Sequence, residues 1–206
     1  MCHALARLIS LAAALLTYPA LATTQDDFRA MIWAGDMSGV KAALQAVEAS
    51  DLASSGEPDA ERALFHIFLE SHPKVAAFTE SWLAAEPDSA LAMTARGWQL
   101  YSTGHNMRGT SYAREVYADA SRADHDYGKQ AFDLAERAVV ADPNLISASD
   151  LILRSTNTLG NRQMIPLELE RIMALHPNRG SLMKVMGTLS QQWGGKLGQV
   201  QLVCDR

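Results

Sequence analysis

The chain has few cysteines, no excess of positive charge, and no apolar run long enough for a membrane span. Only Cys2 and Cys204 occur among 206 residues, so no network of disulfide bonds can hold the fold. The 18 basic residues are outnumbered by 23 acidic ones, which disfavours a nucleic-acid partner. The packing of apolar side chains must therefore stabilise the protein.

The sequence also lacks the motifs of common catalytic and cofactor sites. It contains no Gly-x-Ser-x-Gly elbow, no phosphate-binding glycine loop, and no cysteine in the body of the chain to act as a nucleophile. Asp124-His125-Asp126 and the pair of His66 and His72 have neither the histidine spacing nor the Cys/His clustering of a zinc site. We therefore expect a protein that is not an enzyme, with no catalytic residues, no metal and no cofactor.

Residues 1–22 have the three parts of a secretory signal peptide. A short basic start ends at Arg7, an apolar run covers residues 8–16, and residues 20–22 read Ala-Leu-Ala, a small-x-small cleavage pattern. The run is shorter than the roughly 20 apolar residues that cross a bilayer, so we expect no stable membrane insertion. We predict cleavage after Ala22 and an exported protein, either periplasmic or secreted.

The predicted mature chain, residues 23–206, has a suitable length for a single domain with a substantial core. Cleavage removes Arg7 and no acidic residue, so the formal charge changes from −5 to −6. Cys204 is then the one remaining cysteine, which excludes an internal disulfide bond.

Apolar residues recur at steps of three and four through most of residues 23–206, which predicts an all-α fold. Pro73 and Pro87 bracket one predicted helix, because proline is tolerated at a helix start and interrupts a helix elsewhere. Trp82 lies on the apolar stripe of that helix, and Trp98 lies on the stripe of the next one. Both indole rings are expected in the core.

Polar residues and glycines mark the expected helix ends. Asp36 offers a capping oxygen to a following helix, and Asp126 is expected to cap a helix that starts near Tyr127. Gly104 and Gly160 are expected to end helices. On the helix after Gly160, Glu168 and Glu170 lie two residues apart, so they do not share a face, and an exposed charged surface is the expectation for both.

The prolines of two helix ends, Pro143 and Pro177, lie 34 residues apart, which is the period of tetratricopeptide repeats. Ala131 and Ala138 precede Pro143 at the two positions where that family packs helices closely. The sequence therefore resembles a tetratricopeptide repeat protein, which implies antiparallel helical hairpins stacked as a tetratricopeptide-like solenoid. The next unit departs from the family pattern, with isoleucine at both equivalent positions, Ile165 and Ile172, and Leu153 where the family prefers glycine.

A second resemblance covers most of the mature chain. The signal peptide and four short motifs are similar to those of an uncharacterised family of exported bacterial helical proteins. The motifs are Trp82-Leu83 before Pro-Asp, Ala95-Arg96-Gly97, Arg108-Gly109 and Trp193-Gly194-Gly195. They imply no assigned chemistry.

Residues 104–126 interrupt the repeat, because 56 residues rather than 34 separate Pro87 from Pro143. This segment concentrates arginine and tyrosine in an acidic protein, and both residue types are effective interface anchors. The predicted partner-binding residues are Arg108, Tyr112, Arg114 and Tyr117. The alternative is an elaborated connection whose tyrosines pack on the core and whose arginines neutralise nearby acids.

These observations predict an exported, non-catalytic interaction module that binds a protein or peptide partner through a helical-repeat surface. A narrower version is a periplasmic adaptor or immunity protein. The first alternative is an envelope hydrolase that uses His105 or His125 with a nearby acid. The second is a structural envelope component, which would self-associate without a specific ligand.

Overall fold

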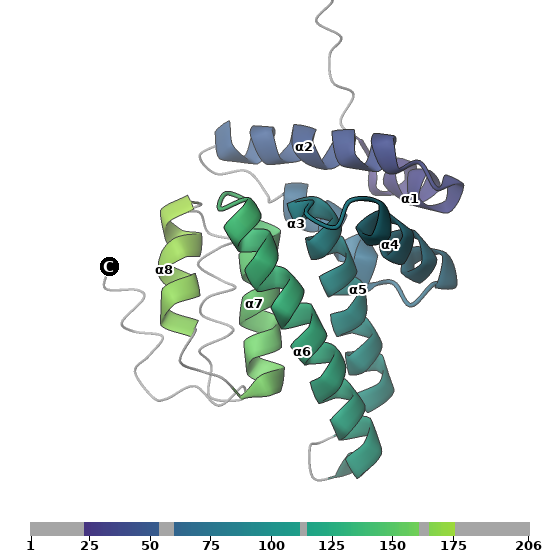
Figure 1. Ribbon diagram of the computed structural model, residues 1–206, viewed down its shortest axis with the longest axis vertical. Helices are drawn as coiled ribbons and strands as arrows, with labels where there is room; N and C mark the ends of the chain where they lie inside the picture. Colours follow the sequence, from purple (N-terminus) through teal and green to yellow (C-terminus); the bar gives the residue numbers. More distant parts are fainter. Residues whose placement is uncertain (1–22, 54–59, 112–114, 161–164, 176–206) are drawn as a thin grey trace, which may run out of the picture.

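A computed structural model describes residues 23–53, 60–111, 115–160 and 165–175 of the chain. These residues form eight α-helices and one short 3-10 helix and contain no β-strand, which confirms the all-α prediction (Figure 1). The predicted signal peptide, residues 1–22, and the predicted repeat boundary at Pro177 lie outside the described residues.

The helices follow one another closely along the chain. In order they are α1 (Gln25–Ala34), α2 (Met37–Ala53), α3 (Ala60–Phe65), the 3-10 helix η1 (His66–Leu69), α4 (Pro73–Ala85), α5 (Ala90–Arg108), α6 (Ala118–Ala141), α7 (Ile146–Leu159) and α8 (Ile165–Leu175). Pro73 begins α4, and α4 ends before Pro87, as the sequence predicts.

Helices α5, α6 and α7 lie side by side at the centre of the molecule, and α8 packs against α7 (Figure 1). Helices α1 and α2 lie across one end of this group, while η1 and α4 pack on α5. One hydrophobic core extends from α1 to α7, and a smaller cluster joins α7 to α8. Trp82 and Trp98 are 0% and 1% exposed, so the prediction that both rings lie in the core is confirmed.

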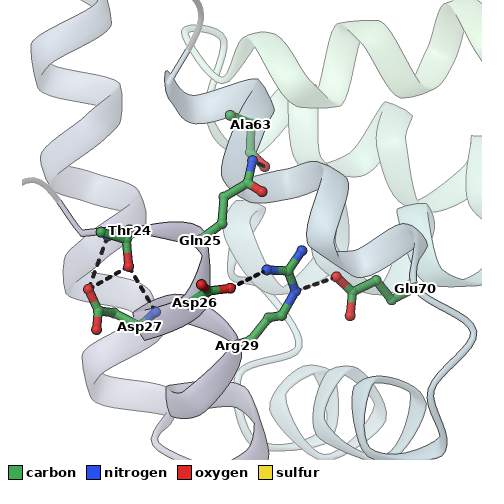
Figure 2. Close-up of polar contacts among 7 residues, drawn as sticks. All are labelled: Thr24, Gln25, Asp26, Asp27, Arg29, Ala63 and Glu70. Atoms are coloured by element: carbon green, nitrogen blue, oxygen red, sulfur yellow. Dashed lines mark hydrogen bonds and ion pairs between the residues drawn. The ribbon is translucent and has the colours of Figure 1, made fainter.

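Helix α1 starts at a capping box that ties its first turn together (Figure 2). The Thr24 hydroxyl oxygen accepts a hydrogen bond from the Asp27 backbone N–H at 3.1 Å, and the Asp27 carboxylate accepts one from the Thr24 backbone N–H at 3.3 Å. Two of the four N–H groups that a helix start leaves free are thereby satisfied. Phe28 and Ile32, one turn apart, then bury the inner face of α1.

Polar contacts attach α1 to the next layer. The Arg29 guanidinium lies between two carboxylates, with Nε 2.5 Å from Glu70 Oε1 and Nη1 2.8 Å from Asp26 Oδ1 (Figure 2). The Gln25 side-chain amide donates to the backbone carbonyl of Ala63 in α3 at 3.4 Å. These contacts orient α1 against α3 and the end of η1.

The structure confirms two predicted helix ends. Asp36 Oδ1 accepts a hydrogen bond from the Gly39 backbone N–H at 2.8 Å, so Asp36 caps α2. Gly160 ends α7 in the left-handed conformation, with φ of 69°, which glycine adopts without steric cost.

Two other expected helix boundaries are wrong. Gly104 lies inside α5, which ends at Arg108 with Gly109 as its C-cap, and Asp126 lies inside α6, which begins at Ala118. A Cβ atom on Gly104 would lie 2.8 Å from the Tyr127 Cβ, so this glycine permits a close approach of α5 to α6 instead of ending a helix. Residues 104–126 are therefore mainly the extended ends of two helices, not one long connection.

Candidate functional site

A groove with a volume of about 810 Å³ opens between α6, α7 and α8, beside the start of α5. Apolar side chains from all four helices line it: Met93, Val139, Val140, Ile152 and Leu167. Charged side chains of both signs also line it: Asp88, Glu136, Arg137, Glu168 and Arg171. An apolar groove with a few polar groups is the usual form of a binding site.

The two sides of the groove carry unusually exposed apolar residues. Val140 near the end of α6 is 82% exposed, and Leu167 near the start of α8 is 60% exposed. Their neighbours Ala138 and Leu169 are buried, so each helix places one apolar side chain in the core and another on the groove. Apolar side chains that border the same groove from two helices indicate a surface that can be covered by a partner.

Both arginines at the groove hold backbone turns. The Arg137 Nη2 group donates to the carbonyl oxygen of Pro87 at 3.0 Å, which ties α6 to the turn between α4 and α5. The Arg171 Nη2 group donates to the carbonyl oxygen of Pro143 at 2.6 Å, which ties α8 to the turn between α6 and α7. These contacts fix the groove's walls relative to each other.

Glu168 differs from the expectation of an exposed charged surface, because it is only 4% exposed. It is one of the residues that line the groove. Burial raises the pKa of Glu168, and the positive charge of Arg171 and a hydrogen bond with Ser149 oppose that rise. The two-residue spacing correctly predicts that Glu168 and Glu170 lie on different faces of the helix. It does not predict which of the two faces is buried.

A second set of buried charges joins α3 to α7 within the core. The Arg62 guanidinium donates two hydrogen bonds to the Asp150 carboxylate, from Nε to Oδ2 at 2.6 Å and from Nη2 to Oδ1 at 3.2 Å. The neighbouring Glu61 accepts a hydrogen bond from the Ser147 backbone N–H at 2.8 Å. These partners are 88 and 86 residues apart, so no local sequence pattern predicts the pairing.

The α3–α7 junction, as we call Glu61, Arg62, Ser147 and Asp150, lies in a strongly desolvated environment. Burial raises the pKa of Glu61 to about 8, hydrogen bonds from Ser147 oppose the rise, and the charges of Glu48 and Asp150 add to it. The four residues of the junction are 3% exposed or less. The junction therefore holds α3 against α7 within the core.

Of the four predicted partner-binding residues, the structure describes Arg108 and Tyr117. Arg108 Nε lies 3.7 Å from Asp124 Oδ2, and Arg108 Nη1 donates to the carbonyl oxygen of Gly109 at 3.1 Å, so its guanidinium is held within the protein. Tyr117 precedes α6 and is 86% exposed. Tyr112 and Arg114 lie outside the described residues.

The two candidate catalytic histidines lie near one acid on the paired helices α5 and α6. His105 stacks on Tyr101 with ring centroids 6.1 Å apart, and His125 Nδ1 lies 3.8 Å from Asp126 Oδ1, too far for a hydrogen bond. Burial raises the pKa of Asp124, while His105, Arg108 and His125 oppose that rise. Asp124 thus interacts electrostatically with both imidazoles, while Asp126 lies beside His125 alone.

Known proteins give no further guide to the site. No protein-family model matches the chain, and no curated protein or solved structure is significantly similar to it. Among the described residues, no three His, Cys, Asp or Glu side chains are grouped so that they could hold a metal ion. The helices within the described ranges are all too short or too polar to cross a membrane.

Proposed function

We propose that this protein is an exported, non-catalytic interaction module that binds a protein or peptide partner in the groove between α6, α7 and α8. The exposure of Val140 and Leu167 on opposite sides of one groove is the observation that carries this proposal. A soluble helical protein normally turns such residues toward its core, and a groove bordered by them loses unfavourable hydration when a partner covers it. A periplasmic adaptor or immunity protein is the narrower form of the proposal.

The repeat interpretation supports a binding role. We propose that the helices from α4 onward form a tetratricopeptide-like solenoid, in which short repeats build a rigid binding surface. Ala131 and Ala138, the small residues of the repeat pattern, are both fully buried on α6. A Cβ atom on Gly97 would lie 2.5 Å from Leu151 Cδ2 in α7 and 3.4 Å from the Ala131 carbonyl oxygen in α6, so this glycine lets α5 pack closely on α7.

Affinity capture from the envelope fraction, with residues 23–206 as bait, tests the proposal. The groove variant Val140→Gln/Leu167→Gln keeps good helix formers and removes both apolar side chains. We expect the affinity for the captured partner to fall at least ten-fold, equivalent to about 1.4 kcal/mol. The matched control is Met107→Gln, which removes an exposed apolar side chain from α5 outside the groove.

The same experiment distinguishes binding at the groove from binding at residues 104–126, the segment rich in arginine and tyrosine. The segment's residues Arg108, Tyr112, Arg114 and Tyr117 stay the second candidate surface, and Tyr117 has the exposure that an anchor needs. Loss of the partner in Tyr117→Ala but not in the groove variant would move the binding site to this segment. Unchanged capture by both variants would contradict both surfaces.

A hydrolase remains the alternative, and the electrostatic interaction of Asp124 with both His105 and His125 is the observation in its favour. An imidazole beside a carboxylate can act as a general base. Purified protein incubated with isolated envelope material should release no soluble fragments if the interaction proposal is correct. Release that disappears in His105→Ala or His125→Ala would replace that proposal with the hydrolase.

A further inference from the structure

The second half of α2, residues 45–51, is attached to the rest of the protein mainly by acidic side chains. The first half of the helix buries three apolar residues in the core: Val40, Ala43 and Leu44. In residues 45–51, Val47 and Glu48 are half-buried, Asp51 is buried, and the other side chains are exposed. Two of the three side chains that attach this half of the helix are therefore carboxylic acids.

Asp51 connects α2 to the α3–α7 junction. Its Oδ2 atom accepts a hydrogen bond from the Glu61 backbone N–H at 2.8 Å, and the Glu61 side chain in turn accepts the Ser147 N–H. Three buried carboxyl groups meet here, those of Asp51, Glu61 and Asp150. Arg62 is the one buried basic side chain in the part of the chain that the structure describes. Three ionised carboxylates would therefore leave an excess of negative charge in the core, which is costly.

Glu48 forms a second acidic contact between α2 and the rest of the protein. Its side chain shares a hydrogen bond with that of Asp142, the C-cap residue of α6. Two carboxyl groups can share a hydrogen bond when one of them holds a proton. Asp142 Oδ1 also accepts the Asn144 backbone N–H at 2.9 Å, so Asp142 serves as the acceptor and Glu48 as the group that holds the proton.

Both protons are lost close to neutral pH. Burial, the charge of Asp142 and their shared hydrogen bond raise the pKa of Glu48 to about 7, and burial raises the pKa of Glu61 to about 8. The charge of Glu48 adds to the rise at Glu61, so the two carboxylates repel each other when both are ionised. The other charged groups that the structure places around this pair are Asp51 on α2, Arg62 on α3, Asp142 after α6 and Asp150 on α7.

We propose that residues 45–51 form a proton-dependent segment, which stays docked on α3 and on the turn after α6 while Glu48 and Glu61 are protonated and separates when both are ionised. Separation returns the ionised carboxylates to water, and it requires the loss of little apolar contact because Val47 is only half-buried. Segments with few buried apolar contacts open locally without unfolding of the whole protein. None of the four acids that contact this segment or belong to it lines the groove, so the inference goes beyond the proposed function and is independent of it.

Hydrogen exchange measured by mass spectrometry on residues 23–206 tests this inference. The quantity compared is the protection factor, which is the exchange rate of an unfolded peptide divided by that of the protein at the same pH. In the wild-type protein the protection factor of residues 45–51 should fall at least ten-fold from pH 6 to pH 8, because the separated segment binds fewer protons than the docked one. It should change much less in Glu48→Gln/Glu61→Gln, whose amide side chains carry no charge.

Low concentrations of denaturant distinguish local separation from unfolding of the whole protein. At pH 8 the exchange of residues 45–51 should not respond to denaturant, whereas peptides from α5 and α6 should exchange more slowly and should accelerate as denaturant is added. The matched control is Glu80→Gln, an exposed acid on α4, which should keep the wild-type pH dependence in residues 45–51. Glu48→Gln alone, at a half-buried position, provides a second test if the double variant does not fold, and it should reduce the fall in protection.

Three outcomes would overturn the inference. The first is a protection factor of residues 45–51 that is the same at pH 6 and pH 8. The second is a fall in protection that persists unchanged in Glu48→Gln and in the double variant. The third is exchange of residues 45–51 at the rate of α5 and α6 with the same response to denaturant, because the protons would then stabilise the whole fold and not the docking of one segment.

Discussion

The α3–α7 junction and the groove each contain a buried glutamate, and their surroundings give the two residues different roles. Glu61 at the junction is 1% exposed, and Glu168 in the groove is 4% exposed. Burial raises the pKa of both carboxyl groups. Glu61, however, accepts a backbone N–H of another helix, whereas Glu168 is one of the residues that line the groove.

Glu61 supplies a helix cap from a distance. The N-cap position of α7 is Leu145, which has no capping side chain, and Ser147 in the first turn donates its N–H to Glu61. An acceptor at a helix start satisfies a free N–H. Burial of a carboxyl group and a raised pKa therefore do not by themselves indicate a ligand site.

The largest expected effect comes from breaking the junction with Arg62→Met. This change leaves the buried Asp150 carboxylate without the guanidinium that holds it through two contacts. Removing one partner of a buried ion pair typically costs about 3 to 5 kcal/mol in the free energy of unfolding. Chemical denaturation monitored by circular dichroism measures this loss.

The double variant Arg62→Met/Asp150→Leu is the control for that prediction. It replaces both charged side chains with apolar side chains that can fill the same space, so most of the lost stability should return. A single variant as stable as the wild-type protein would show that the junction contributes little. In that case the junction could not be distinguished from the groove by its contribution to stability.

The second effect is a dependence of stability on pH that originates at Glu61. Its pKa is about 8 in the folded protein, well above its ordinary value of 4.5, so between these pH values the folded state holds a proton that the unfolded state releases. Stability from this group is therefore fully present at low pH and falls as pH rises toward 8, by up to about 1.4 kcal/mol per pH unit. Thermal melts from pH 5 to pH 8 measure the slope.

Glu61→Gln isolates this contribution, because the amide oxygen can still accept the Ser147 N–H and carries no charge. The variant should lose much of the pH slope and should be more stable than wild type near pH 8. Glu48 gives a remaining slope of the same sign, since burial and then the charge of Asp142 raise its pKa to about 7. Glu80→Gln, at an exposed position, should keep the wild-type slope.

These two predictions concern residues that sequence patterns did not pair, and the reason is distance along the chain. Local signals predicted the bounds of α4 from Pro73 and Pro87, the cap of α2 from Asp36, and the core position of Trp98. Each of these depends on a few consecutive residues or on one helical stripe. The contact between Arg62 and Asp150 depends instead on how α3 and α7 pack.

Local sequence signals that were misinterpreted also show that packing between distant helices cannot be predicted from a few consecutive residues. Gly104 is typical of a helix end, yet the close approach of α6 makes it an interior residue of α5. The capping box of Thr24 and Asp27, followed by Phe28 and Ile32, is a signal for α1 that sequence reasoning missed although it is local. The groove could not be predicted, because the exposure of Val140 follows from where α8 stands relative to α6.

The smallest expected effect on stability comes from the groove variant Val140→Gln/Leu167→Gln. Both side chains are mainly exposed, and glutamine suits a helix, so the free energy of unfolding should change by less than about 0.5 kcal/mol. Ile152→Ala, at the 1% exposed lining residue of the same groove, should lose about 2 to 5 kcal/mol. Denaturation curves of the two variants give this comparison directly. A loss above about 1 kcal/mol in the double glutamine variant would mean that Val140 and Leu167 stabilise the free protein by contacts within the chain, and the groove would then be part of its packing instead of a surface for a partner.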